Sequence, residues 1–383
     1  MKIAVNTRLL LPGKLEGIGW FSYENLKRIT TDHPEHQFYF LFDRPYHRDF
    51  IFSDNVIPLV AGPPARHPVL YYVWFEITVR RLLKKTGADL FLSPDGYLSL
   101  GSKVPSIAVF HDLNFEHYPD DLPRAERWYY RTFFRKYASK AARIATVSEY
   151  SKADITSQYG TDPGKIDVVY NGANEDYLPV NESVKSETRK KYTGGRPYFF
   201  FVGSLHPRKN LVNLFRAFDL YKKTDNRNTV LLLAGAKKWW TGEIASVYES
   251  MEFKNDVIFS GRLETSEMRN VMGSAIALTY VSYFEGFGIP IVEAFRCGTP
   301  VITSNITSMP EVGGDAALYA DPFKPGEIAD AMIKIANDDT LREQLIKAGT
   351  ERAGIFTWDQ SARRLWQTME KALAAQTDFS ARL

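Results

Sequence analysis

The segment from Ser282 to Glu293 holds the densest set of residues that could do chemistry. It places Glu285 and Glu293 on either side of Gly286-Phe287-Gly288, with Pro290 just beyond. Carboxylates accept hydrogen bonds from hydroxyl groups, and glycines let a backbone wrap closely around a ligand. Pro290 suits the first turn of a helix, so Glu285 would lie before that helix and Glu293 inside it. A tight strand-to-helix turn with one surface glutamate and one capping glutamate explains the same residues equally well.

Two cations follow the apolar run Tyr198–Val202. Gly203 comes directly after that run, and Arg208 and Lys209 precede a helical stretch that begins at Leu211. A diphosphate at this position would meet two positive charges and the N–H donors of a helix start. An exposed basic pair is more often solvated surface, and the pair alone does not exclude that alternative.

The first half of the chain offers weaker candidates. Gly17 and Gly19 precede a helical stretch from Trp20, where they either approach a phosphate or form a flexible turn. His111 ends the apolar run Ser106–Phe110, and a histidine there can bind a hydroxyl, transfer a proton or be structural. Ser148 follows another such run and either lies near phosphate or caps a helix.

Short apolar runs alternate with helical patterns along the whole chain. Continuous runs such as Ile107-Ala108-Val109-Phe110 are typical of strands covered on both faces of a parallel sheet. The predicted strands are Lys2–Leu9, Gln37–Phe42, Asp89–Leu92, Ser106–Phe110, Arg143–Val147, Ile166–Val169, Tyr198–Val202, Thr229–Ala234, Asp256–Ser260, Ala275–Tyr280 and Pro300–Thr303.

The alternation stops between Asn171 and Arg196, where polar residues and the lack of an apolar period predict a linker. Two β/α alternations joined by a linker predict an α/β protein of two doubly wound, Rossmann-like domains that face each other. Ligands of open α/β sheets bind beyond the carboxyl ends of the strands, which is where the candidate residues fall.

Composition and missing motifs exclude several classes of protein. The net charge of +3 gives no reason to expect nucleic acid, and no apolar run approaches the length of a membrane span. The single Cys297 excludes an internal disulfide framework. The sequence contains neither Asp-x-Asp nor a zinc spacing of histidines, so no metal ligands are predicted. An NAD-dependent oxidoreductase, the rival enzyme class, needs a Gly-x-Gly-x-x-Gly turn after a strand, which this chain lacks.

Taken together, these motifs resemble the retaining glycosyltransferases of family four, which have the GT-B fold. Glu285 and Glu293 are similar to the family's Glu-x7-Glu signature, and Gly203 with Arg208-Lys209-Asn210-Leu211 resembles its diphosphate-binding loop. Further matches are Cys297-Gly298-Thr299-Pro300-Val301, Thr146-Val147-Ser148-Glu149-Tyr150-Ser151, Val168-Val169-Tyr170-Asn171-Gly172 and Gly17-Ile18-Gly19. The family often has two adjacent glycines in its N-terminal loop, whereas Glu16 precedes Gly17 in this chain.

The resemblance implies a role for each site residue. Arg208 and Lys209 are expected to neutralise the diphosphate leaving group without a metal ion, Glu285 to bind sugar hydroxyls and Glu293 the ribose. His111 is expected to contact the sugar near the reacting carbon. The expected donor contacts also include Gly17, Gly19, Ser148, Gly203, Arg262, Leu263, Gly286, Phe287 and Gly288.

The resemblance also implies domain roles. Residues 1–180 are expected to bind the acceptor and 196–357 the nucleotide sugar, while a helix within 358–383 crosses back to the first domain. No cofactor or metal is expected. The stretch His111-Asp112-Leu113-Asn114 favours the mannosyltransferase-like subgroup, hence GDP-mannose, with a UDP-sugar as the alternative donor. A sugar-nucleotide-binding protein without catalysis is the other alternative.

The implied acceptor is a glycan or lipid-linked glycan of surface polysaccharide synthesis, and the implied location is the cytoplasm or the inner face of the membrane. Residues 124–143 interleave aromatic side chains with seven basic residues and one acidic residue. Such a segment either rests on anionic lipid or forms a core-facing aromatic stripe with a solvated basic face. The second interpretation is preferred for this segment.

Overall fold

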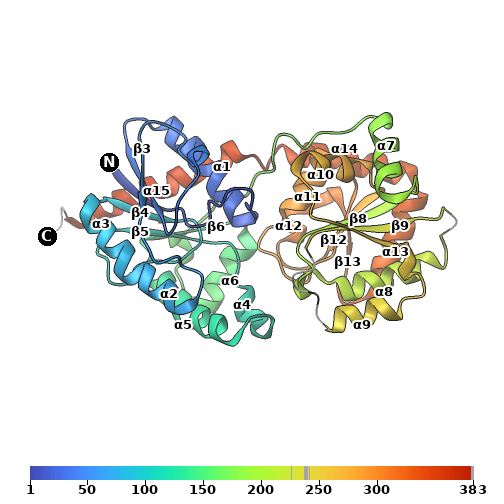
Figure 1. The fold of residues 1–383 in the computed structure, drawn as a ribbon, viewed down its shortest axis with the longest axis horizontal. Coiled ribbons are helices and arrows are strands. Elements are labelled where there is room, and N and C mark those ends of the chain that lie inside the picture. The colour runs from blue at the N-terminus through green and yellow to red at the C-terminus, as the bar shows by residue number, and fades with distance from the viewer. Residues whose placement is uncertain (226, 237–239, 241, 381–383) are drawn as a thin grey trace. The chain divides into compact units, whose positions relative to one another are not determined.

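The computed structural model describes residues 1–225, 227–236, 240 and 242–380 of the chain. The polypeptide forms two compact units, each built around one β-sheet (Figure 1). The first unit contains Met1–Gly172 and the C-terminal segment that begins at Trp358, and the second contains Ala173–Thr357. The sequence pattern ends the first domain at residue 180 and starts the second at 196, whereas the two units meet between Gly172 and Ala173.

The first unit contains a seven-stranded parallel sheet in the order β3-β2-β1-β4-β5-β6-β7. The central strands are apolar and buried along their length, as the continuous apolar runs predict. The strands are β1 (Lys2–Asn6), β2 (Gln37–Phe42), β3 (Val56–Val60), β4 (Leu90–Ser93), β5 (Ser106–Phe110), β6 (Arg143–Thr146) and β7 (Ile166–Val168). The helices are α1 (Gly17–Asp32), α2 (Pro68–Val73), the π-helix η2 (Trp74–Val79), α3 (Arg80–Thr86), α4 (Asn114–His117), α5 (Arg124–Lys140), α6 (Glu149–Tyr159) and α15 (Trp358–Ser380), with 3-10 turns η1 (Arg48–Phe50), η3 (Pro119–Asp121) and η4 (Pro163–Lys165).

The second unit contains a six-stranded parallel sheet in the order β10-β9-β8-β11-β12-β13. Its strands are β8 (Tyr198–Val202), β9 (Val230–Ala234), β10 (Val257–Gly261), β11 (Ala277–Tyr280), β12 (Val301–Ser304) and β13 (Ala317–Ala320). The helices are α7 (Glu182–Thr193), α8 (Leu211–Lys222), α9 (Gly242–Ser250), α10 (Thr265–Ser274), α11 (Ile289–Arg296), α12 (Met309–Gly313), α13 (Pro325–Asn337) and α14 (Asp339–Ala353), with 3-10 turns η5 (Pro207–Lys209), η7 (Lys254–Asp256) and η8 (Gly314–Ala316).

Both sheets follow the same doubly wound path. In each, the first strand lies near the centre, the next two strands extend to one edge, and the fourth strand lies on the other side of the first. The strand order therefore reverses between β1 and β4 in the first sheet and between β8 and β11 in the second. This arrangement confirms the prediction of two Rossmann-like domains, and it marks the two reversal points as the places where such sheets bind ligands.

The sequence pattern misses two strands, and both lie at a sheet edge. β3 contains Pro58 and leaves Val60 about half exposed, and two of the four residues of β13 are only partly buried. An edge strand bonds to a single neighbour, so β3 tolerates a proline that would argue against a central strand.

The prediction of a linker from Asn171 to Arg196 is wrong for much of its length, because α7 forms within it. The Asn181 side chain accepts a hydrogen bond from the Val184 N–H at the start of this helix, and Gly194 ends it in the left-handed conformation. The helix lies on the outside of its unit and buries few residues, so it shows no apolar period.

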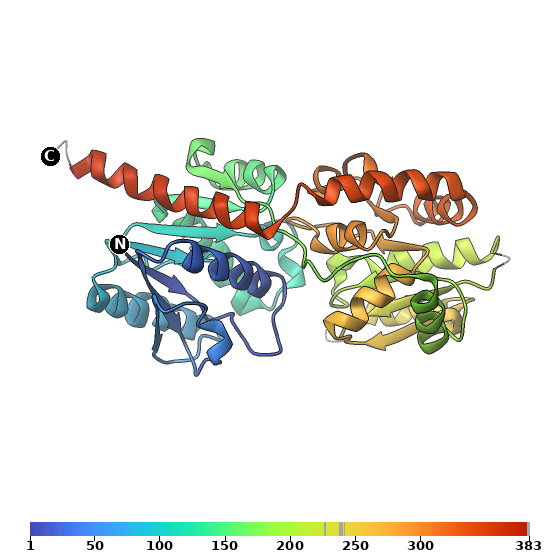
Figure 2. The same ribbon diagram turned by 90° about the horizontal axis from the view of Figure 1, so that it is seen from above.

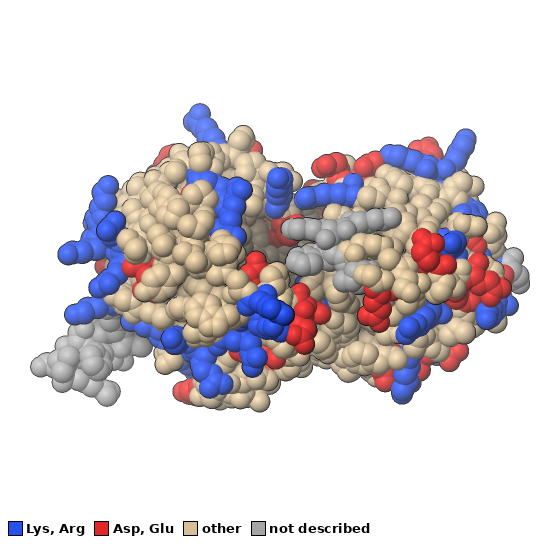
Figure 3. Space-filling view, turned by 60° about the horizontal axis from the view of Figure 1, so that its bottom comes forward, with Lys and Arg blue, Asp and Glu red and all other residues tan. Residues whose placement is uncertain are grey.

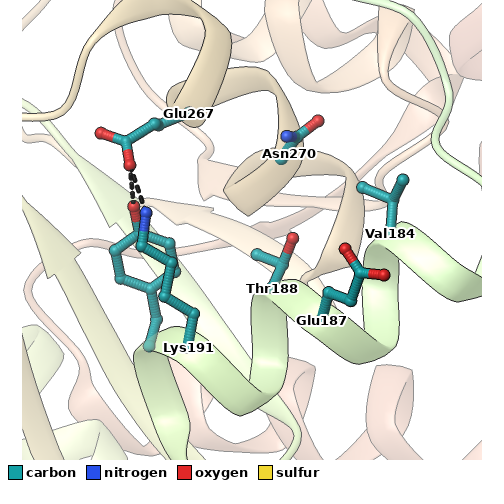
Figure 4. A pocket seen from close by; sticks show the side chains of 7 residues that line it. Val184, Glu187, Thr188, Lys191, Glu267 and Asn270 are labelled. Carbon is teal, nitrogen blue, oxygen red and sulfur yellow. Dashed lines mark hydrogen bonds and ion pairs between the residues drawn. The ribbon is translucent and has the colours of Figure 1, made fainter.

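α7 is held to α10 by polar contacts rather than by a wide apolar face. Lys191 and Tyr192 both donate hydrogen bonds to Glu267, at 2.5 and 2.8 Å, and Arg189 donates to the Ser274 carbonyl. A small cavity lies between the two helices, with Thr188 on one wall (Figure 4). These contacts depend on residues about 80 positions away in the chain, which local sequence patterns cannot register.

The last helix, α15, packs along the first unit and against α1 (Figure 2). Its Leu365 and Met369 are buried, and the rings of Trp366 and His33 stack with their centroids 3.6 Å apart. Although α15 is the longest helix described, neither it nor any other helix in the described residues is long and apolar enough to cross a membrane.

α5 lies within the basic aromatic segment 124–143. Its Tyr129, Phe134 and Tyr137 are buried in the core of the first unit, which confirms the core-facing interpretation for these residues. Trp128 on the same helix is different, because 62% of it is exposed.

Candidate functional site

The loops after β8 and β11 meet at the reversal point of the second sheet. The two strands are parallel hydrogen-bonded neighbours, so their carboxyl ends leave the sheet side by side. The loop after β8 carries Arg208 and Lys209 on the turn η5, and the loop after β11 carries Glu285. The topology thus brings together charged residues that are 76 and 77 positions apart in the chain.

Glu285 bridges the two cations. The Arg208 Nη1 donates to Glu285 Oε2 at 2.7 Å, and the Lys209 Nζ donates to Glu285 Oε1 at 2.5 Å. Lys209 Nζ also donates to the Tyr280 hydroxyl at 2.5 Å, and Arg208 reaches the Phe284 carbonyl. Each oxygen of the carboxylate therefore faces a different cation.

Burial sets the electrostatics of this cluster. Glu285 and Lys209 are almost fully buried, whereas about a quarter of the Arg208 side chain is exposed. Burial alone would raise the pKa of Glu285, but the adjacent charges of Arg208 and Lys209 hold it at about 2. The Glu285 carboxylate is thus ionised at neutral pH.

The turn η5 is fixed from both ends. Gly203 leaves β8 with a φ of 145°, and Asn210 ends the turn in the left-handed conformation. The Asn210 Nδ2 donates to the carbonyls of Val281 and Pro322, at 3.0 and 2.6 Å, so the turn is fastened to the loops after β11 and β13. Asparagine adopts this left-handed conformation more readily than most residues, so Asn210 suits the end of the turn.

The glycine loop after β11 is held by the start of α12. The hydroxyl of Ser308 lies 2.9 Å from the Glu285 carbonyl and 3.2 Å from the Phe287 carbonyl. Gly288 precedes α11 with a φ of 100°, and a Cβ there would lie 2.9 Å from Met309 Cε. Only glycine fits this position without strain, and Pro290 follows in the first turn of α11 as predicted.

Glu293 lies inside α11, about one turn from its start, and is partly buried. Burial raises the pKa of Glu293 to about 7, although a hydrogen bond from Tyr177 lowers it. The Tyr280 hydroxyl is close enough to interact with both Glu285 and Glu293, which raises the pKa of that tyrosine beyond the effect of its burial. The two glutamates of the signature are therefore in one neighbourhood, with opposite pKa shifts.

Arg262 and Leu263 follow β10, at the same carboxyl edge of the second sheet but two strands away from β8. Arg262 is exposed and Leu263 is partly buried. Their assignment to the base of a nucleotide stays a prediction.

In the first unit, His111 follows β5 and is held in one orientation. Its Nε2 donates to the Pro94 carbonyl at 2.8 Å, and its ring contacts Phe21 edge-on at 5.0 Å between centroids. Burial lowers the pKa of His111, so the ring is neutral at pH 7, with its proton on Nε2 and a lone pair on Nδ1.

Ser148 is the N-cap of α6. Its hydroxyl is fully buried, accepts a hydrogen bond from the Ser151 N–H at 3.0 Å and contacts the Ser151 hydroxyl. Ser148 therefore caps a helix, which is one of the two alternatives that the sequence left open. Its contact with a phosphate stays a prediction. The Ser151 hydroxyl reaches the His111 carbonyl, which ties the start of α6 to the end of β5.

Gly17 and Gly19 lie in the first turn of α1 rather than in a loop before it. A Cβ on Gly17 would meet no atom within 4 Å, whereas one on Gly19 would lie 3.2 Å from the Leu9 carbonyl. The first N–H groups of a helix lack partners within the helix, so this turn keeps the donors that a phosphate needs.

Sequence reasoning missed a buried polar network at the reversal point of the first sheet. Asn6 Nδ2 and Arg8 Nε donate to the two carboxylate oxygens of Asp95, at 2.7 and 2.5 Å, and Arg8 lies 4.5 Å from the centroid of the Tyr97 ring. All four residues are buried. The sequence pattern that indicates this network is Asn6-Thr7-Arg8, where polar residues end an otherwise apolar strand.

No group of three or more histidine, cysteine or acidic side chains that could hold a metal ion occurs within the described part of the chain. Arg208 and Lys209 supply positive charge where β8 and β11 end in the second sheet. Two cations, a carboxylate and a glycine loop at a helix start form a chemical set suited to an anionic ligand that also carries hydroxyl groups.

Two family models match the chain, one for each domain. Residues 31–177 match the model for glycosyltransferase family 4, and residues 184–352 match the model for glycosyl transferases group 1. The candidate residues of the second unit, from Gly203 to Glu293, lie inside the second match.

Characterised relatives and solved structures agree with these matches. The chain is 28% identical over 255 residues to the O-antigen chain mannosyltransferase B of Escherichia coli, covering 66% of this chain and 67% of the relative. It is 27% identical over 269 residues to the O-antigen chain mannosyltransferase RfbU of Salmonella typhimurium, covering 70% and 71%. Sucrose-phosphate synthase from Thermosynechococcus elongatus has a similar fold, with a TM-score of 0.76, 18% identity and coverage of 98% and 99%. The two family matches and the paired Rossmann-like sheets identify this chain as a glycosyltransferase of family four with the GT-B fold.

Proposed function

We propose that this enzyme is a retaining mannosyltransferase that uses GDP-mannose. In this proposal it extends a glycan or lipid-linked glycan in surface polysaccharide synthesis. The observation that carries the proposal is the cluster of Arg208, Lys209 and Glu285 at the reversal point of the second sheet. The choice of mannose is supported by the two O-antigen mannosyltransferases among the relatives and by the His111-Asp112-Leu113-Asn114 stretch.

In the proposed reaction, Arg208 and Lys209 stabilise the diphosphate as it leaves the sugar. Charge develops on the phosphate oxygen while the bond to the anomeric carbon breaks, and two fixed cations stabilise that charge without a metal ion. The N–H groups of Gly286, Phe287 and Gly288 and of the α11 start add donors, and Gly203 lets the backbone come close.

The remaining residues hold the two sugars of the donor. Glu285 accepts hydrogen bonds from hydroxyls of the transferred sugar, and Glu293 accepts them from the ribose. The neutral His111 uses its Nδ1 to accept a hydrogen bond from a sugar hydroxyl near the anomeric carbon. The acceptor oxygen attacks from the face that the diphosphate leaves, and its proton passes to the departing phosphate oxygen, so configuration is retained.

The alternative donor is a UDP-sugar, because no described contact distinguishes guanine from uracil near Arg262 and Leu263. A thermal-shift screen separates the alternatives. GDP, UDP and their sugar conjugates are compared with ADP and NAD, with and without EDTA. A ligand at ~100 times its dissociation constant adds about 2.7 kcal/mol of stability.

GDP is expected to stabilise the protein even when EDTA removes metal ions. Turnover of GDP-mannose would then support the proposed reaction. Stabilisation by UDP alone would move the donor to a UDP-sugar. Binding without turnover on any mannoside acceptor would favour a sugar-nucleotide-binding protein, and a response to NAD alone would contradict the donor site.

An apolar patch on the first unit supports peripheral contact with the inner leaflet of a membrane. Val69 and Trp128 are more than 60% exposed, and Tyr72 is about half exposed. Tyr72 and Trp128 both pack against Phe133, and Lys136 lies over the ring of Phe133 at 5.2 Å from its centroid. Basic side chains are prominent on the face of the first unit that Figure 3 shows. Aromatic residues among cations favour an anionic lipid surface.

Vesicle sedimentation tests this contact. The wild-type protein is expected to bind vesicles that contain phosphatidylglycerol at low salt and to release them at high salt. Trp128→Ser with Tyr72→Ser should remove most of the binding, while Leu220→Ser, which alters an exposed apolar residue of the second unit, should not. Equal binding by both variants would contradict the proposed surface.

A further inference from the structure

In the proposed diphosphate site, a carboxylate of the protein itself already pairs with the two cations. The Glu285 carboxylate uses one oxygen for Arg208 and the other for Lys209, at 2.7 and 2.5 Å. These are the same two cations that the proposed function assigns to the diphosphate. Lys209 Nζ has three N–H donors, and two of them point to Glu285 and Tyr280.

A diphosphate therefore competes with Glu285 for the two cations. Charge-assisted hydrogen bonds to a buried carboxylate are strong, and a buried carboxylate that loses its partners is costly. Glu285 and Lys209 are both almost fully buried, so water compensates little for a broken pair. Any ligand that takes the cations must give Glu285 other donors or leave it poorly satisfied.

The donor and the product differ in whether they can offer Glu285 new hydrogen-bond donors. A nucleotide sugar brings hydroxyl groups that donate to the displaced carboxylate, whereas a nucleotide diphosphate brings none at that position. We propose that Glu285 is a specificity residue that selects the nucleotide sugar over the nucleotide diphosphate product. The exchange weakens binding of the product and returns the carboxylate to Arg208 and Lys209 once the sugar has left.

This inference rests on the proposed donor site, and it predicts that loss of the Glu285 charge increases the affinity for the diphosphate product. If Glu285 only fastened the loop or only bound the sugar, neutralising it would weaken every ligand or leave the product unaffected. If Glu285 competes with the diphosphate, Glu285→Gln must bind the product more tightly. The variant keeps the shape of the side chain and one acceptor oxygen but removes the competing charge.

Isothermal titration calorimetry with GDP, GDP-mannose, UDP, UDP-glucose and inorganic pyrophosphate tests the inference on the full chain. For the nucleotide that binds the wild type, Glu285→Gln is expected to tighten the diphosphate form by about tenfold. The same change is expected to weaken the nucleotide sugar or leave it unchanged, so the preference for the donor falls by tenfold or more. Unchanged or weaker binding of the diphosphate by the variant overturns the inference.

Two control variants separate charge from shape. Glu285→Asp keeps the charge with a shorter reach and should not tighten GDP or pyrophosphate. Glu293→Gln changes the other glutamate of the segment, for which no contact with Arg208 or Lys209 is described, and should change GDP and GDP-mannose alike. Tighter GDP binding by Glu285→Asp, or a gain for GDP but not for GDP-mannose in Glu293→Gln, would contradict the role of the Glu285 charge.

The structure of the wild-type protein bound to GDP gives a second measurement that does not depend on a folded variant. The ion pairs from Glu285 to Arg208 and Lys209 should be broken when the diphosphate is bound. Intact pairs beside a bound diphosphate would overturn the inference and leave the proposed function standing. If neither the wild type nor Glu285→Gln binds any nucleotide or pyrophosphate, the proposed function fails as well.

Discussion

At the scale of single residues, two glutamates of one segment have opposite electrostatic environments. Glu285 faces two cations, which hold its pKa at about 2 against the effect of burial. Burial raises the pKa of Glu293 to about 7, although Glu293 accepts a hydrogen bond from Tyr177. Two carboxyl groups eight positions apart in the sequence thus have pKa values that are shifted in opposite directions.

The raised pKa of Glu293 predicts a pH-dependent effect of Glu293→Gln on stability. The unfolded chain loses this proton near pH 4.5 and the folded chain near pH 7, so the folded state is penalised as the pH rises between these values. The penalty is complete above pH 7 and amounts to roughly 3 kcal/mol at most. Glu293→Gln removes it, so urea unfolding should show a more stable variant at pH 8.

The comparison at pH 5 serves as the control for this prediction. Most of the Glu293 carboxyl groups are neutral in the folded protein at that pH, so glutamine and glutamate should differ little. An equal gain of stability at pH 5 and pH 8 would show that packing, rather than ionisation of Glu293, accounts for the change.

At the scale of elements, the site is built where strands end and helices begin. The loop after β11 must turn sharply into α11, and Gly288 makes the turn with a φ of 100°. Ser308 at the start of α12 fixes the same loop through two carbonyls. The position of Glu285 therefore depends on the backbone of its own loop and on a neighbouring helix.

Gly288→Ala is expected to destabilise the protein by roughly 2 kcal/mol or more and to weaken nucleotide binding. The backbone at this position has a left-handed conformation that alanine disfavours, and the added Cβ would lie 2.9 Å from Met309 Cε. Urea unfolding and titration with GDP measure the two effects. The matched change Gly17→Ala adds a Cβ in open space at the first turn of α1 and should alter stability by less than about 1 kcal/mol. Equal losses from both substitutions would argue against the strain at Gly288.

At the scale of the whole molecule, each unit has a hydrophobic cluster of its own, and the two sheets share one strand order over six strands, with β7 added in the first. The proposed diphosphate cluster belongs entirely to the second unit, while the last helix of the chain packs on the first. Stability of the first unit and nucleotide binding by the second are therefore expected to respond to different substitutions.

Leu365→Ala in α15 tests this separation. Leu365 is 1% exposed, so removing its side chain should cost about 2–5 kcal/mol in the first unit. The affinity for GDP, measured at a temperature where the variant is folded, should stay within about twofold of the wild type. The exposed neighbour Gln367→Ala should change neither quantity. A large loss of GDP affinity in Leu365→Ala would show that the first unit also shapes the diphosphate site.

The sequence determined the parts that depend on local pattern. Buried central strands consist of continuous apolar residues. For this reason the sequence pattern predicts strands with the bounds that the structure shows, such as Gln37–Phe42, Ser106–Phe110 and Tyr198–Val202. Glycines, cations and carboxylates after those runs marked the candidate site, because parallel strands present their carboxyl ends at one edge. Two of the four edge strands, β3 and β13, were not predicted, and neither was α7, a polar helix without an apolar period.

The tertiary structure alone decided how the site residues interact. Nothing local to Arg208, Lys209 or Glu285 indicates that they form one ion cluster, because the pairing follows from β8 and β11 being neighbours in the sheet. The pKa shifts of the two glutamates could not be predicted from the sequence either, because burial and nearby charge come from distant segments. Side-chain type and order are local properties of a chain, whereas distance, burial and electrostatic partners arise only when strands far apart in sequence pair.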